Sequence, residues 1–147
     1  MDYKNMTEDM AREGFGCGID CSMAVAGHCA DKVGIDESTA VKAMAAFGGG
    51  MWHGETCGAV VGALMSLGLK YGNCEPGDTE SKNALLAKKG EFEAAFIEKF
   101  GTLKCKELLG YDLSIPEEMN KAMEEGLLMT LCPKLVAGAC EIMDELL

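Results

Sequence analysis

The chain has 147 residues, a formal net charge of −11 and a hydrophobic fraction of 48%. This length suits one domain, residues 1–147, that buries a core without needing disulfides. The acidic balance, with no basic stripe, excludes nucleic acid as a partner and disfavours an anionic membrane surface. The first twelve residues hold neither an apolar run nor a small-residue cleavage site. We therefore expect no secretory signal, a cytoplasmic location and reduced cysteines.

The least charged stretch, residues 43–69, contains Glu55 as its single charge. The glycines at 48–50 and the residues 52–55 interrupt this stretch, so that only residues 57–69 are continuously apolar or small. That run is shorter than the roughly 20 residues that cross a bilayer. It predicts a buried core helix and no membrane span.

Along the chain the pattern predicts helices, because strand alternation is absent and β-branched residues are few. Asp20, Asp36 and Asp78 are expected to begin helices as N-caps, and Gly34 and Gly101 to end them. The longer predicted helices cover residues 21–33, 36–47, 56–71, 79–100, 116–131 and 133 onward, with shorter segments at 1–13 and 102–109. We expect a compact all-α bundle of about six to seven helices.

Four of the eight cysteines fall at the predicted starts of separate helices, and these are Cys21, Cys57, Cys105 and Cys132. The first turn of a helix offers unpaired N–H groups and the positive end of the helix dipole. A thiol placed there ionises more easily, and the thiolate is the form that attacks disulfides or binds metal. The sequence therefore predicts a redox or metal centre where helix starts converge.

The spacing of these four cysteines argues against several kinds of metal and redox site. No Cys-x-x-Cys pair occurs in the chain, which argues against a zinc knuckle, a thioredoxin-like centre and covalent haem attachment. Four distant thiolates suit an iron–sulfur cluster, which four cysteines commonly hold. They equally suit a pair of low-pKa thiols that cycles with a disulfide. Spacing alone does not separate these two alternatives.

The remaining cysteines have simpler interpretations, with one exception. Cys29 and Cys140 share apolar helix stripes and are expected in the core, and Cys74 lies in a polar turn. Cys17, four residues before Cys21, is a candidate fifth ligand or resolving thiol. A lone histidine such as His53 is more often structural than a ligand or proton donor.

Several segments together resemble the small redox-active proteins that are named for a C…GCAxxG…C…C cysteine signature. The segments are Cys-Ser-Met-Ala-Val at 21–25, Phe-Gly-Gly-Gly-Met at 47–51, residues 56–65 and 67–72, Cys-Lys-Glu-Leu-Leu-Gly at 105–110, and Cys-Pro-Lys-Leu-Val at 132–136. The resemblance implies that the family's four cysteines are the four at the helix starts. The family also looks related to split-Soret cytochromes, dimers that carry an iron–sulfur centre beside their haems. Because the haem-attachment motif is missing here, no haem is expected.

This sequence departs from the family pattern in three places. Cys57 lies between Thr56 and Gly58, where the signature has Gly-Cys-Ala. Bulky Trp52 and His53 stand beside the glycines, and Cys17 is additional. These departures leave open whether the centre has the family's usual set of ligands.

The first hypothesis is a cytoplasmic electron-transfer protein with an iron–sulfur cluster of unspecified type on Cys21, Cys57, Cys105 and Cys132. Gly49 and Gly50 would cover the cluster and donate N–H groups to its sulfurs. The alternatives are a dithiol–disulfide oxidoreductase and a thiolate metal carrier or sensor. In the oxidoreductase, Cys57 would attack the substrate disulfide, and Cys105, Cys132 or Cys17 would resolve the resulting mixed disulfide. Whether the protein is an enzyme stays open; an enzyme of this kind would be an oxidoreductase.

Two kinds of protein partner follow from the same hypothesis. One is a redox partner of unspecified identity. The other is a second copy of the chain, because Gly58 and Gly62 lie four residues apart and would allow close helix packing.

Overall fold

A computed structural model describes all residues from Met1 to Leu147 and contains helices without any strand. The α-helices are α1 (Glu8–Gly16), α2 (Cys21–Val33), α3 (Glu37–Ala43), α4 (Gly58–Tyr71), α5 (Thr79–Phe100), α6 (Cys105–Leu109), α7 (Pro116–Glu124), α8 (Leu127–Thr130) and α9 (Cys132–Leu146). Two short turns complete the chain, η1 (Tyr3–Asn5) and η2 (Gly50–Gly54). The predicted all-α class is confirmed, and the nine α-helices exceed the six to seven expected.

The additional helices arise where the chain bends. Gly126 adopts a left-handed conformation with φ of 70°, which divides the predicted helix at 116–131 into α7 and α8. The predicted N-terminal helix is likewise split into η1 and α1, because the Thr7 side chain accepts a hydrogen bond from the Met10 N–H at 3.2 Å and caps α1. Local cap and turn chemistry thus divides segments that apolar periodicity joins.

Most predicted helix boundaries are confirmed by their capping geometry. Asp36 and Asp78 each accept a backbone N–H from three residues ahead, at 2.9 and 3.0 Å. Gly34 and Gly101 end α2 and α5 with φ of 74° and 96°, a conformation that glycine adopts without steric cost. Asp20 precedes α2 as predicted, but its side chain makes no capping hydrogen bond.

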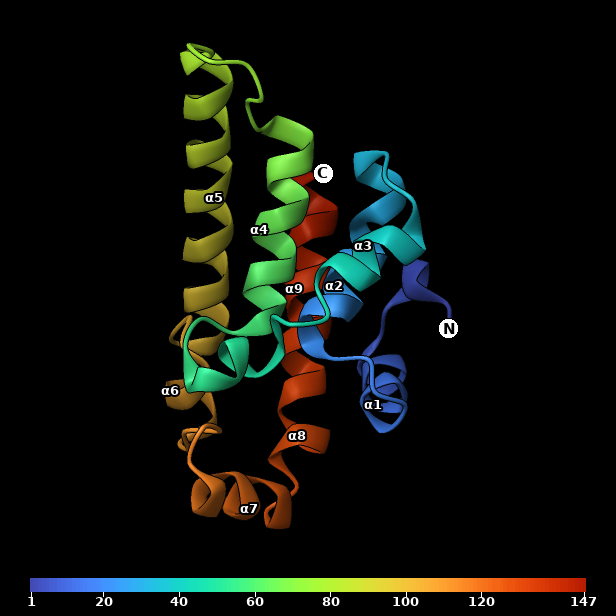
Figure 1. Ribbon diagram of the computed structural model, residues 1–147, viewed down its shortest axis with the longest axis vertical. Coiled ribbons are helices and arrows are strands. Elements are labelled where there is room, and N and C mark those ends of the chain that lie inside the picture. The colour runs from blue at the N-terminus through green and yellow to red at the C-terminus, as the bar shows by residue number, and fades with distance from the viewer.

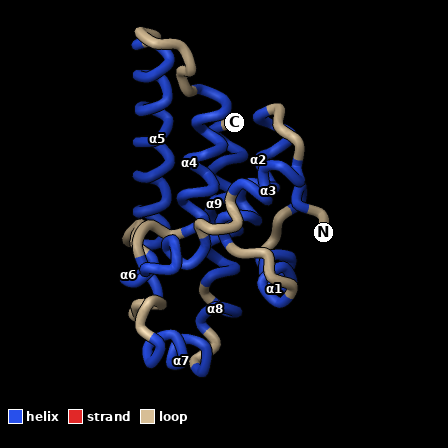
Figure 2. The backbone as a smooth tube through the Cα atoms, viewed as in Figure 1, coloured by secondary structure: helices blue, strands red, loops and turns tan.

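The core is shared by four helices. In Figure 1, α4 and α5 form a long antiparallel hairpin, and α9 passes behind α4 beside α2. Figure 2 shows that loops are confined to the ends of these helices. Their fully buried side chains include Val25, Val60, Leu67, Phe92, Phe96, Val136 and Met143. This arrangement gathers the starts of α2, α4 and α9 near one region of the molecule.

Gly58 and Gly62 of α4 pack against another helix of the same chain. A Cβ on Gly58 would collide with the Cys21 Sγ, and one on Gly62 would lie 2.5 Å from the Ser22 carbonyl oxygen. These glycines therefore let α2 approach α4 closely. The expectation that the Gly58/Gly62 face packs against a second copy is wrong, because α2 occupies it.

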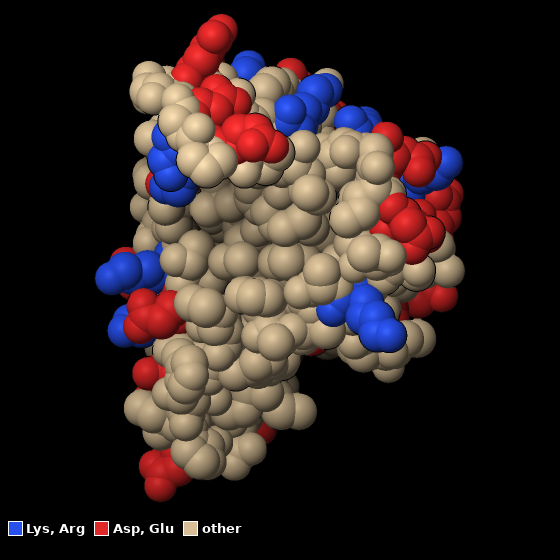
Figure 3. All heavy atoms as spheres, turned by 45° about the horizontal axis from the view of Figure 1, so that its top comes forward, with Lys and Arg blue, Asp and Glu red and all other residues tan.

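One face of the molecule is largely uncharged at its centre. In Figure 3, uncharged residues cover the centre of the visible face, and charged side chains lie around its edge. No single helix has both the length and the apolar composition of a membrane span; α7 together with Leu127–Leu146 meets those criteria as a pair bent by 56°.

Candidate redox centre

The four predicted cysteines converge on one cavity. Cys21, Cys105 and Cys132 are the first residues of α2, α6 and α9, and Cys57 is the N-cap of α4. All four line a cavity of about 290 Å³. The predicted helix starts are thus confirmed, and the fold brings together residues that lie up to 111 positions apart (132 − 21).

A short backbone pairing holds Cys57 beside Cys105. The Cys57 N–H donates to the Leu103 carbonyl at 2.7 Å, and the Cys105 N–H donates to the Glu55 carbonyl at 2.6 Å. Thr56 and Lys104 form the antiparallel bridge between these bonds. Two segments 48 residues apart (105 − 57) are therefore fixed side by side just before α4 and α6 begin.

Cys21 and Cys57 form a hydrogen-bonded thiol pair. The Cys57 thiol donates to the Cys21 sulfur, which also accepts from the backbone N–H groups of Gly49 and Ser22, and together these bonds lower the pKa of Cys21. The same bond to Cys21, together with burial, raises the pKa of Cys57 well above its ordinary value. Of these two thiols, Cys21 therefore has the lower pKa and ionises first.

The role predicted for Cys57 stays a prediction. The helix-start argument treats all four thiols alike and names Cys57 as the attacking thiol. The bonds to Cys21, one of them from the Gly49 N–H of a separate loop, lower the pKa of Cys21 and make it the other candidate for that role.

The other two cavity cysteines are held in the neutral form. Burial raises the pKa of Cys105 to about 12, and the charges of Cys21 and Asp112 add to the effect. Burial and the nearby Cys21 and Cys105 also raise the pKa of Cys132. Without a bound cation, Cys57, Cys105 and Cys132 are therefore neutral thiols, because burial and their neighbours disfavour the charged form.

The glycine-rich loop adopts an unusual conformation beside the cysteines. Gly49, Gly50, Met51 and Trp52 all have φ between 58° and 64°. For a non-glycine residue the left-handed region costs about 1–2 kcal/mol. Two such residues, Met51 and Trp52, occur in succession at the mouth of the cavity. Backbone strain of this kind is typical of functional sites.

The two predicted glycines have different roles in this loop. Gly49 lines the cavity, and its N–H is bonded to the Cys21 sulfur. Gly50 does not line the cavity. A Cβ on Gly50 would lie 2.5 Å from the Glu55 nitrogen and 2.9 Å from the Cys105 Cβ, so its role is to allow close packing behind Cys105.

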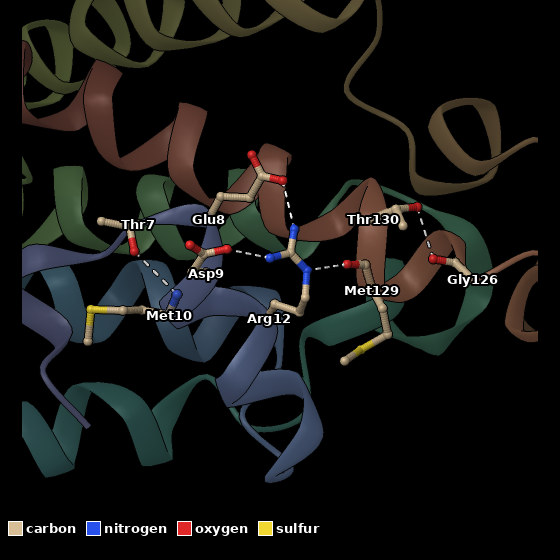
Figure 4. Close-up of polar contacts among 8 residues, drawn as sticks. All are labelled: Thr7, Glu8, Asp9, Met10, Arg12, Gly126, Met129 and Thr130. Atoms are coloured by element: carbon tan, nitrogen blue, oxygen red, sulfur yellow. Dashed lines mark hydrogen bonds and ion pairs between the residues drawn. The ribbon is translucent and has the colours of Figure 1, made fainter.

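The remaining wall of the cavity comes from the segment 108–129. Leu109, Leu113, Met119 and Leu128 are among its apolar lining residues. Arg12 of α1 is hydrogen-bonded to this wall, because its Nε donates to the Met129 carbonyl at 2.7 Å (Figure 4). The same guanidinium forms ion pairs with Glu8 and Asp9. Nothing in the sequence identifies this wall, because its apolar residues have the spacing of ordinary core positions.

Asp20 is a cavity residue that the sequence identified only as a helix cap. It lines the cavity beside Cys21, and burial raises its pKa. Gly48 packs against its Cβ, where a second Cβ would lie 2.7 Å away. Its position directly before Cys21 was the available signal.

The other candidate residues lie outside the cavity. Cys17 and Cys74 are exposed, and Cys29 and Cys140 are buried elsewhere. His53 is exposed and does not line the cavity. The structure therefore does not bring Cys17 or His53 to the centre, and it confirms Cys29 and Cys140 as core residues.

Comparison with known proteins identifies the family of the chain. Residues 19–146 match the family model described as "Putative redox-active protein (C_GCAxxG_C_C)". The chain belongs to this family. The matched range contains the four cavity cysteines and leaves out Cys17. The chain has no significant match among curated proteins or solved structures.

No group of three or more histidine, cysteine, aspartate or glutamate side chains is close enough to hold one metal ion. The four thiols line a single cavity, and four cysteines are the number that commonly ligates an iron–sulfur cluster.

Proposed function

We propose that the protein is an electron-transfer protein that binds an iron–sulfur cluster through Cys21, Cys57, Cys105 and Cys132. The observation that carries this proposal is the convergence of four helix-start thiols on one apolar cavity. Membership of the redox-active family supports it. The bound cluster would supply one-electron transfer.

The surrounding residues have defined roles in this proposal. Helix starts and the Gly49 N–H place hydrogen-bond donors beside the sulfur ligands, which stabilises negative charge. The apolar wall on α7 and α8 excludes water and lowers the local dielectric constant. Cys57, Cys105 and Cys132 are protonated without metal, so binding releases protons and strengthens as pH rises.

The setting of the proposed function follows from composition. A cytoplasmic location would keep the thiols reduced and available. A net charge of −11 favours a redox partner protein with a basic face, because opposite potentials steer association.

Anaerobic purification tests the cluster directly. The expected protein is coloured, contains iron and acid-labile sulfide, and loses its visible absorption on oxidation or chelation. Cys105→Ser should remove at least nine-tenths of the iron, whereas Cys17→Ser, at an exposed site outside the cavity, should retain it. A colourless protein that takes up neither iron nor sulfide during anaerobic reconstitution would refute the proposal.

A second function is favoured by the hydrogen-bonded pair Cys21 and Cys57. In a dithiol–disulfide exchange, the Cys21 thiolate attacks a substrate disulfide and releases one thiolate, forming a mixed disulfide. Cys57 then loses its proton and attacks the Cys21 sulfur, which releases the second substrate thiolate and leaves a Cys21–Cys57 disulfide. The protein's two thiols lose two electrons, and the substrate disulfide gains them.

Peptide mapping distinguishes this second function. Treatment of the metal-free protein with oxidised glutathione should yield a Cys21–Cys57 disulfide, and Cys57→Ser should trap glutathione on Cys21. Random pairing among the eight cysteines would contradict it. A single-ion carrier has no comparable observation in its favour, given the absence of a group placed to hold one ion.

A further inference from the structure

The cavity extends beyond the four sulfur atoms toward solvent. Its outer part is lined by Trp52 of η2, Met123 of α7 and Met129 of α8. These side chains are 44%, 58% and 40% exposed, although each also lines the cavity. Apolar side chains from three segments therefore surround one opening, whereas isolated exposed apolar residues are ordinary.

The charges of the cavity restrict what can enter. Its lining includes no lysine, arginine or histidine, and Asp20 is its single charged residue. A phosphate or carboxylate would find no cation to pair with and would lose its hydration. At about 290 Å³ the cavity is near the lower end of small-molecule sites. The fitting ligand is therefore small, neutral and largely apolar.

Trp52 provides a flat wall for such a ligand. The left-handed turn holds its ring against Gly49, where a Cβ would lie 2.8 Å from the Trp52 Cε3. The strained left-handed backbone thus includes Trp52, one of the residues that line the opening of the cavity. Aromatic faces favour stacked or edge-on contact with another ring.

We propose that the outer part of the cavity binds a neutral quinone-type ring as an electron carrier. The proposal rests on the dithiol–disulfide function above, because it needs Cys21 and Cys57 free of metal, and it names that function's small-molecule substrate class. A quinone takes up two electrons and two protons to become a hydroquinone. Two thiols give up two electrons and two protons when they form a disulfide, so the exchange with Cys21 and Cys57 balances.

The single tryptophan gives a direct measurement. The probe is tetramethyl-1,4-benzoquinone, whose fully substituted ring disfavours thiol addition. Titration into the metal-free protein should quench Trp52 fluorescence to a saturating value. Free N-acetyltryptophanamide, titrated in parallel, gives the linear collisional contribution.

Two variants locate the site. Met123→Glu adds a charge at the opening and should raise the half-saturating probe concentration at least tenfold. Leu86→Glu makes the same change at a 50% exposed position on α5 outside the cavity and should leave it unchanged. Circular dichroism verifies that both variants are folded.

The outcomes separate this site from the cluster. Linear quenching in the wild type, or equal half-saturation in the Met123→Glu variant, would overturn the quinone site. Saturable quenching in a protein that never assembles a cluster would refute the cluster and leave the quinone site standing.

Discussion

Two sets of cysteines occupy contrasting regions of this molecule. The cavity set is Cys21, Cys57, Cys105 and Cys132, at four helix starts around an opening. The core pair is Cys29 and Cys140, inside α2 and α9 at 0% and 1% exposure. Backbone N–H groups within a helix are already bonded in its own ladder, whereas those of the first turn are free. Position along the helix therefore decides which thiols have donors available.

The difference is visible in the thiol energetics. Burial raises the pKa of Cys29 to about 11, and the Ser66 hydroxyl only partly offsets it. Burial also raises the pKa of Cys140. Cys21 lies on the same helix as Cys29, yet its pKa is lowered because Cys57 and backbone N–H groups donate to it. Within the cavity set this difference is carried by Cys21 alone, because the pKa values of Cys57, Cys105 and Cys132 are raised as well.

The first and largest test of this comparison replaces cysteine by serine at the start and in the middle of α9. Cys132→Ser should lower the bound iron at least tenfold and leave the fold intact, because the residue is only partly buried. Cys140→Ser should retain the iron but lower the free energy of unfolding by about 1–3 kcal/mol, since it buries a hydroxyl in an apolar setting. Iron analysis and urea unfolding measure the two effects. Iron loss from both variants would remove the distinction between the regions.

A second prediction compares two thiols of α2 by alkylation of the metal-free protein. At pH 7, iodoacetamide should modify Cys21 at least a hundredfold faster than Cys29, because Cys21 is partly exposed and has the lowered pKa. As the pH falls, Cys21 should stay reactive below the range of an ordinary thiol with a pKa of 9.0. Mass spectrometry of timed samples gives the rates. Equal rates, or Cys57 reacting first, would contradict the assigned thiolate.

Most of the fold and the cysteine selection could be predicted from the sequence, because both depend on local signals. The caps at Asp36 and Asp78 and the end at Gly101 are local, as is the placement of cysteines at helix starts. The convergence of α6 with α4 could not be predicted, since it depends on the pairing of Thr56 with Lys104. The role of Gly58 was likewise hidden, because only tertiary structure shows α2 against it.

A third prediction tests that close approach with two glycines of α4. Gly58→Ala places a Cβ against the Cys21 Sγ and 2.9 Å from the Phe47 carbonyl oxygen. It should destabilise the protein by about 1–3 kcal/mol, as overpacking does, and reduce iron binding. Gly68→Ala meets no atom within 4 Å and should be neutral or stabilising by about 0.5–1 kcal/mol. Thermal unfolding and iron content are the measurements, and equal effects of the two changes would refute a role for Gly58 in seating Cys21.

The smallest expected effect concerns Asp144, which lies on the same helix as the core residue Cys140. Asp144 of α9 accepts from the His28 Nε2 at 2.8 Å and pairs with Lys32, both on α2. These contacts outweigh burial and lower the pKa of Asp144 below 3.8. Because the folded value is the lower one, the carboxylate stabilises the fold above pH 3.8, and the contribution is lost as pH falls through the folded pKa.

Replacing Asp144 therefore tests the core region without altering the cavity. Asp144→Ala should lower the free energy of unfolding by about 1 kcal/mol at neutral pH, since the side chain is half-exposed. The difference from wild type should shrink below pH 3.8, and iron content should stay unchanged at neutral pH. Urea unfolding across this pH range measures it. A constant difference would mean that packing around α2 and α9, and not the carboxylate charge, provides the stability, while loss of iron would show that the two cysteine regions are coupled.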